Sequence, residues 1–141
     1  MKVLGLDLGD ASLGLAISDN TQTIARGLEN YRFDKDDFTQ ALNKVKSIVA
    51  KEPISIIVLG YPKNMDNTIG VQAQKTKHFK TMLNEHLDIP VILKDERLTS
   101  KLAGQTMIFA KKARKKRKKS LDQMSAVILL QQYLDEKKEV R

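Results

Sequence analysis

The order of the predicted elements indicates an α/β fold in which a mixed β-sheet carries helices on its faces. Three strands come first, at 2–8, 13–19 and 24–33, and the tight turn GDAS makes the first two antiparallel. Helices and strands then alternate, and strands joined by a crossover helix run parallel to each other. The 141 residues are enough for one core, so we expect a single domain over 1–141.

The first strand is predicted by an apolar run that contains one carboxylate. Its alternation places side chains on two opposite faces of the sheet, with Leu4, Leu6 and Leu8 on one face and Val3, Gly5 and Asp7 on the other. Because a carboxylate removed from water is costly unless it is paired, Asp7 needs either a structural partner or a ligand.

The middle of the chain predicts a helix and then a buried strand. Residues 34–52 begin with an acidic stretch and end before Pro53. Their apolar residues recur at helical spacing, at Phe38, Leu42, Val45, Ile48 and Val49. The segment ISIIVLG, 54–60, is continuously apolar, which is typical of a strand covered on both faces.

The second half of the chain predicts one more strand among three helices. After a loop, a helix is expected over about 69–87, a strand over 91–96 and a helix over 99–110. A final helix begins behind Ser120, a favourable N-cap residue.

The basic residues are concentrated in one stretch. The chain has 25 Lys and Arg against 17 Asp and Glu, and eight of the 25 lie in KKARKKRKK, residues 111–119. Without these eight the two signs balance, so the excess forms one patch that favours contact with a polyanion. A solvated loop without a ligand is the alternative, and repulsion between the cations favours a loop over a helix. The residues expected to hold a phosphate backbone are Lys111, Lys112, Arg114, Lys115, Lys116, Arg117, Lys118 and Lys119.

Composition excludes several classes of protein. The chain has no Cys, which excludes disulfides and thiolate metal sites. The start MKVLGLDLG is too short in its apolar part for a signal peptide. The uncharged stretch QMSAVILLQQYL has 12 residues, too few to cross a bilayer. We therefore expect a cytoplasmic protein without membrane contact.

Carboxylates are the candidate catalytic groups. Asp122 shares one face of the last helix with Ala126, Leu129 and Tyr133, the face expected to pack on the sheet near Asp7. Asp95 and Glu96 stand where a parallel strand ends, and they point to opposite faces. Converging carboxylates stay ionised only when cations compensate them, and oxygen ligands without Cys suit Mg²⁺ or Mn²⁺. Two such ions can support hydrolysis of a phosphodiester bond.

Four ordered motifs carry a family resemblance over nearly the whole chain. They are GLDLG with LGLAISD, LGYPKNMDNTIG, DERLTS, and KKARKKRKKSLDQMSAVILLQQYL. Together they resemble the YqgF family, also called RuvX, of Holliday junction resolvase-like proteins. The resemblance implies a ribonuclease H-like fold, with a five-stranded mixed sheet in the order 3-2-1-4-5, an antiparallel second strand and helices on both faces. It also implies a nuclease that processes the 5′ end of precursor 16S ribosomal RNA.

The resemblance also implies a set of site residues. The catalytic and metal-binding acids would be Asp7, Glu96 in an E-x-x-T motif, and Asp122, which hold one or two Mg²⁺ or Mn²⁺ ions. The family pattern thus selects Glu96 over Asp95. Further contacts with substrate are expected from Lys63, Asn64, Arg97 and Thr99. The chain departs from the family at Asp10, which adds a negative charge near the expected ions.

Several functions stay open at this point. The leading hypothesis is a metal-dependent endonuclease for structured RNA, and the first alternative is a Holliday junction resolvase for branched DNA. A second alternative is a non-catalytic RNA-binding factor in ribosome assembly, in which the acids are structural. The strand-turn-strand also resembles the phosphate loop of actin-like ATPases and sugar kinases, but those need two such domains. Partners could include the ribosome or its assembly factors, and the protein could act as a monomer or a homodimer.

Overall fold

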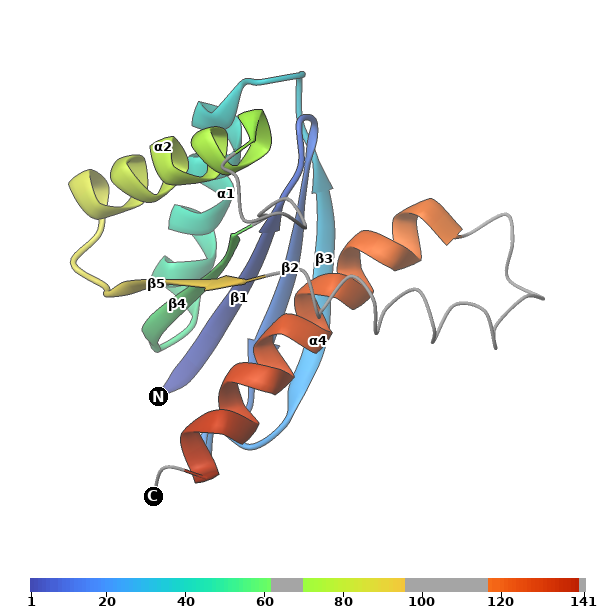
Figure 1. Cartoon of the computed structure of the whole chain (residues 1–141). Helices are drawn as coiled ribbons and strands as arrows, with labels where there is room; N and C mark the ends of the chain where they lie inside the picture. The colour runs from blue at the N-terminus through green and yellow to red at the C-terminus, as the bar shows by residue number, and fades with distance from the viewer. Residues whose placement is uncertain (62–69, 96–116, 140–141) are drawn as a thin grey trace.

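The structure is a computed structural model that describes residues 1–61, 70–95 and 117–139, with side chains in the last range described for 124–137. Within these ranges the chain forms five strands and three helices (Figure 1). The strands are β1 (Lys2–Leu8), β2 (Ser12–Ser18), β3 (Ala25–Arg32), β4 (Ile54–Tyr61) and β5 (Val91–Asp95). The helices are α1 (Phe38–Lys51), α2 (Val71–His86) and α4 (Arg117–Glu139).

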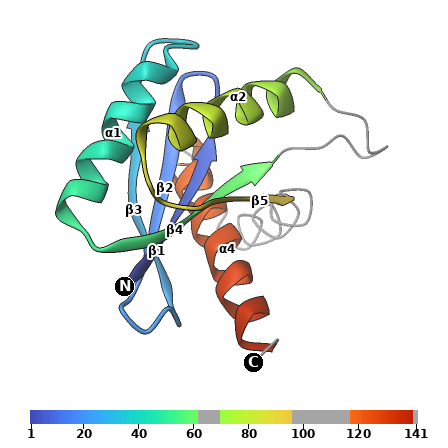
Figure 2. The same ribbon diagram turned by 90° about the vertical axis from the view of Figure 1, so that its left-hand side faces the viewer.

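The strands form one mixed sheet, which confirms the predicted fold class. Its order is β3-β2-β1-β4-β5. Strand β2 runs antiparallel to both of its neighbours, while β1, β4 and β5 are parallel to one another. Helices α1 and α2 lie on one face of this sheet and α4 crosses the other (Figures 1 and 2).

The core has one apolar layer on each face of the sheet. Leu4, Leu6 and Leu8 of β1 belong to the layer that contains the buried residues of α1 and α2. Val3 belongs to the other layer, which it forms with Val58 of β4 and with residues of α4. The alternation predicted for β1 is therefore correct, because the two sets of its side chains enter different layers.

Helix α4 lies very close to β1 at Gly5. A Cβ placed on Gly5 would lie 2.9 Å from the Cβ of Leu130 and 3.3 Å from the backbone oxygen of Ala126. Real Cβ atoms do not come within 3.0 Å of such an atom. Glycine therefore allows the helix to lie directly on the strand.

The first helix begins later than its acidic residues suggest. Asp34, Asp36 and Asp37 precede α1, which begins at Phe38. Asp36 has a φ of 60°, outside the helical region, and its backbone N–H donates to the carbonyl of Asp10 at 2.7 Å. A tertiary contact thus fixes this segment outside the helix.

The last helix begins earlier than predicted, at Arg117 instead of Ser120. Three residues of the basic run are therefore helical, where repulsion favours a loop. Lys and Arg are good helix formers, and extending an existing helix costs little compared with nucleating one. The predicted helix over 99–110 and residues 62–69 of the preceding loop lie outside the described residues. In the described ranges, no helix combines the length and apolar character needed to cross a membrane.

Asp19 organises the turn between β2 and β3. Its carboxylate accepts hydrogen bonds from the Thr21 hydroxyl at 2.6 Å and from the backbone N–H groups of Thr23 and Ile24 at 2.8 and 3.2 Å. These bonds, the Thr21 bond first, lower the pKa of Asp19 from 3.8 to about 2.

The contribution of this turn to stability should therefore be present above about pH 4 and be lost as the pH falls towards 2. Carboxyl ¹³C chemical shifts measured against pH should give Asp19 a midpoint near 2. A midpoint at the ordinary 3.8 would show that the hydrogen bonds do not persist in solution.

Candidate functional site

Asp7 stands near the carboxyl end of β1, on the face of the sheet that α4 covers. It pairs with Gly14 of β2, and Gly5, two residues earlier on the same face, contacts α4. Its side chain is half-buried. Leu6 pairs with Leu59 of β4, so Gly60, the next residue of that strand, follows beside Asp7. The carboxylate therefore stands on the sheet with a glycine on each neighbouring strand.

Helix α4 runs antiparallel to β1, and its amino-terminal half lies towards the Asp7 end of the sheet (Figure 1). The carboxyl-terminal half lies at the other end, where the side chain of Lys137 donates to Gln22 at 3.0 Å. Asp122 belongs to this helix, one turn before Ala126, whose carbonyl faces Gly5. Its backbone thus lies on the amino-terminal side of the contact with Gly5, as Asp7 lies on the carboxyl-terminal side.

The other predicted acid and the substrate contacts lie outside the described residues. Glu96 directly follows Asp95, which ends β5 and pairs with Tyr61 at the end of β4. Lys63, Asn64, Arg97, Thr99 and basic-run residues 111–116 fall in the undescribed ranges. For Arg117, Lys118, Lys119 and Asp122 the structure describes the helical backbone alone. Within the described part of the chain, no three His, Asp or Glu side chains converge as a metal site.

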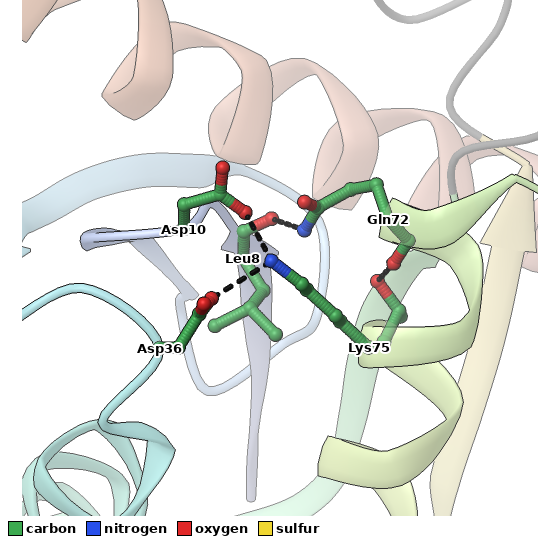
Figure 3. A network of polar contacts seen from close by, with 6 residues as sticks. Leu8, Asp10, Asp36, Gln72 and Lys75 are labelled. Carbon is green, nitrogen blue, oxygen red and sulfur yellow. Dashed lines mark hydrogen bonds and ion pairs between the residues drawn. The ribbon is translucent and has the colours of Figure 1, made fainter.

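Helix α2 holds the turn that follows Asp7 through two polar side chains (Figure 3). Gln72 donates from its side-chain nitrogen to the backbone carbonyl of Leu8 at 3.0 Å. The ammonium group of Lys75 lies 3.1 Å from the carboxylate of Asp10 and 2.8 Å from that of Asp36. One cation thus joins the β1–β2 turn to the segment before α1.

Lys75 also forms an ion pair with Asp10, the residue at which the chain departs from the family pattern. Its hydrogen bonds to Asp36 and Asp10, in that order of strength, raise the pKa of Lys75 above its usual value. The negative charge of Asp10 is therefore only partly compensated, because the cation is shared with Asp36. Gln72 and Lys75 are absent from the site expected from sequence because they are more than 60 residues from the turn they bind, and no local pattern connects them.

Asn30 of β3 is a third residue near the site that could not be predicted from the sequence. It pairs with Gly14, which in turn pairs with Asp7, so the three residues form one row across β1, β2 and β3. Both polar atoms of its side-chain amide are buried, and among the residues that the structure describes neither has a hydrogen-bond partner. Buried amides are normally satisfied, so this one calls for an explanation.

Comparison with known proteins identifies relatives over nearly the whole length. A Geobacillus protein named "Putative pre-16S rRNA nuclease" is 42% identical over 137 residues, which are 97% of this chain and 99% of the relative. A protein of the same name from Bacillus licheniformis is 42% identical over 135 residues, 96% of this chain and 97% of the relative.

The fold is also found among solved structures. RuvC of T. thermophilus, in complex with a Holliday junction substrate, has a TM-score of 0.65 at 14% identity, and the match covers 98% of this chain and 96% of RuvC. At this low identity the likeness concerns the fold, which is thus the predicted ribonuclease H-like sheet. The family model described as "RuvX: Holliday junction resolvase" matches residues 1–136. Together with the near full-length relatives, this match shows that the chain belongs to the RuvX family of nucleases.

Proposed function

We propose that this protein is a metal-dependent endonuclease that processes the 5′ end of precursor 16S ribosomal RNA. The observation that carries the proposal is the position of Asp7, a half-buried carboxylate near the end of a central strand, on the sheet face that α4 covers. The chain belongs to a family of nucleases, and the RNA named for its near full-length relatives is the proposed substrate.

The cofactor proposed is Mg²⁺ or Mn²⁺, as one or two ions held by Asp7, Glu96 and Asp122. The described residues fit such an ion, because Asp7 offers carboxylate oxygens beside a glycine, Gly14, that occupies no side-chain space. Hard oxygen donors of this kind suit Mg²⁺ and Mn²⁺. When bound there, the ion would supply activation of a water molecule and stabilisation of the leaving oxygen of the phosphodiester. The role of Asp7 is to hold the ion against the sheet.

The basic run, residues 111–119, is proposed to bind the phosphate backbone of the RNA. Its eight cations carry the whole positive excess of the chain. Lys63, Asn64, Arg97 and Thr99 are proposed to contact the substrate beside the acids. Processing of an RNA end needs one active site, so a cytoplasmic monomer is sufficient, with precursor ribosomal particles as its partner.

Neutralising four cations of the run should weaken binding to all sequences alike. Replacing Lys111, Lys112, Lys115 and Lys116 by Gln should lower the slope of log K against log salt by roughly 3–4 units on a duplex. Filter binding across a salt series measures this slope. A matched control replaces four lysines of α1 and α2, on the opposite sheet face from Asp7: Lys46, Lys51, Lys77 and Lys80. Equal slopes for the two variants would show that the run has no special part in binding.

A second candidate function is cleavage of Holliday junctions, which the description of the family favours. The deciding experiment incubates the purified protein with a precursor 16S RNA fragment and with a four-way DNA junction, each with Mg²⁺, Mn²⁺ or EDTA. Metal-dependent cleavage of the RNA near the mature 5′ end supports the proposal. Faster cleavage of the junction would assign the DNA substrate instead. Binding of the RNA without cleavage under any condition would identify a non-catalytic RNA-binding factor.

A further inference from the structure

The row of paired residues that crosses the sheet from Asp7 ends at Asn30, whose side-chain amide has no role in the site described so far. Asp7, Gly14 and Asn30 occupy matching positions on β1, β2 and β3. Paired residues in a sheet project their side chains to the same face. Asn30 thus stands on the α4 face, with a residue that has no side chain between it and Asp7.

A bulge puts Asn30 on this face. Ala25, at the start of β3, belongs to the apolar layer beneath α4. Strict alternation from Ala25 would turn Asn30, five residues later, towards α1 and α2. The register of β2 and β3 shifts between Leu15 and Ala16, and the extra residue on β3 reverses the alternation beyond it. The chain thus uses an irregularity to bring an amide to the face that carries Asp7.

Burying the side-chain amide of Asn30 has a free-energy cost. Both its oxygen and its nitrogen are buried and lack hydrogen-bond partners among the described residues. A buried polar group without a partner opposes folding, and a leucine of similar size would avoid that cost. Packing alone therefore does not explain why an asparagine occupies this position.

The distance between β1 and β3 decides whether Asp7 can form a hydrogen bond with the amide of Asn30 directly. Two inter-strand spacings of about 4.8 Å separate the backbones of β1 and β3. Two short side chains do not reach a common hydrogen bond across that gap, so any link between them needs a bridging group. Mg²⁺ binds oxygen ligands at about 2.1 Å and keeps several of its waters in protein sites. A coordinated water can donate to an amide oxygen at about 2.8 Å.

We propose that Asn30 is an outer ligand of the site, whose amide binds a water molecule coordinated to the divalent cation held by Asp7. The inference rests on the metal site of the proposed function and adds to it a residue outside the three acids. Asn30 is a positioning residue: it orients the hydration shell of the ion, and it does not touch the ion itself. Outer contacts of this kind change metal affinity by about 10- to 100-fold.

The test is a calorimetric titration of Mg²⁺ and Mn²⁺ into the full-length protein, without nucleic acid. Asn30→Leu and Asn30→Ala should each bind the ions about 10- to 100-fold more weakly than the wild type. Asn30→Leu should also melt at a higher temperature than the wild type in the absence of metal, because it removes a buried polar group. Weaker metal binding together with greater stability is a combination that loss of packing would not produce.

Two controls separate the possible failures. Asn43→Leu makes the same change on the exposed surface of α1 and should leave metal affinity unchanged. Asp7→Asn should abolish binding. Wild-type affinity in either Asn30 variant would overturn the inference and leave the metal site standing. Absence of metal binding by the wild type would overturn the metal dependence of the proposed function, and Asn30 with it. If Asn30→Leu is unstable, the metal affinity of Asn30→Ala decides, because alanine adds no bulk at this position.

Discussion

Cleavage by the Asp7→Asn variant is expected to be about a thousandfold slower than cleavage by the wild type, with the fold preserved. The substitution keeps the shape of the side chain and removes its charge. An amide cannot neutralise a divalent cation, so the ion proposed to stabilise the transition state would be lost or misplaced. A thousandfold loss corresponds to about 4 kcal/mol in activation free energy, which is within the several kcal/mol that a catalytic metal supplies.

The affinity of the Asp7→Asn variant for RNA should not fall with its cleavage rate. Asp7→Asn removes a negative charge from the surface proposed to face the phosphate backbone, so affinity for RNA should be unchanged or slightly higher. Single-turnover cleavage and fluorescence anisotropy separate the two effects. Asp88→Asn is the matched control, because Asp88 is exposed and precedes β5, at the opposite end of the parallel strands from Asp7. This control should cleave at the wild-type rate.

Other outcomes would assign Asp7 a different role. Cleavage by Asp7→Asn at the wild-type rate would make the carboxylate structural and favour catalysis at another site. Loss of binding together with cleavage would indicate that the variant is misfolded, which circular dichroism would reveal. Absence of cleavage in both the variant and the wild type, with equal binding, would support the RNA-binding factor.

The sheet could be predicted from sequence because its strands carry strong local patterns. Alternation in β1 assigns Leu4 and Val3 to different layers, and the structure confirms both assignments. The continuous apolar run of β4 indicates a strand buried on both faces, as Val58 and Leu59 in opposite layers show. Such patterns can be read from the local sequence, because apolar side chains mark the positions that are buried in the fold.

The parts that could not be predicted depend on contacts between distant segments. The start of α1 is set by the bond from Asp36 to Asp10, and the turn after Asp7 is held by Lys75. Asn30 reaches the α4 face through a bulge, which reverses the faces that simple alternation would assign. Apart from Asp10, none of these residues stands out locally, because each acquires its role from a partner that only the folded chain brings near.

Replacing Gly5 by Val should destabilise the protein by about 3 kcal/mol, the upper end of the usual cost of overpacking. The new Cβ would lie 2.9 Å from the Cβ of Leu130, which is fixed to the helix backbone and cannot turn aside. Leu130 and Ala126 are fully buried, so the strain can be relieved only by moving α4 away from the sheet. Urea unfolding measures the loss.

Two further variants test this explanation of the Gly5 effect. Leu130→Ala should fail to rescue Gly5→Val, because the alanine retains the Cβ that is closest to Gly5. Gly70→Ala, at a glycine with an ordinary φ of −84°, should change stability by less than about 1 kcal/mol. Rescue by Leu130→Ala would instead place the clash at the end of the leucine side chain.

The same substitution should also reveal how the packing of α4 supports the site. Gly5 lies two residues before Asp7 on the same sheet face, and α4 carries Asp122 one turn before the contact with Gly5. A helix lifted from β1 moves Asp122 away from Asp7 even while the protein stays folded. Gly5→Val should therefore bind Mn²⁺ more weakly than its folded fraction accounts for, as calorimetry well below its melting temperature would show. Wild-type affinity in the folded variant would mean that Asp7 binds the ion without help from α4.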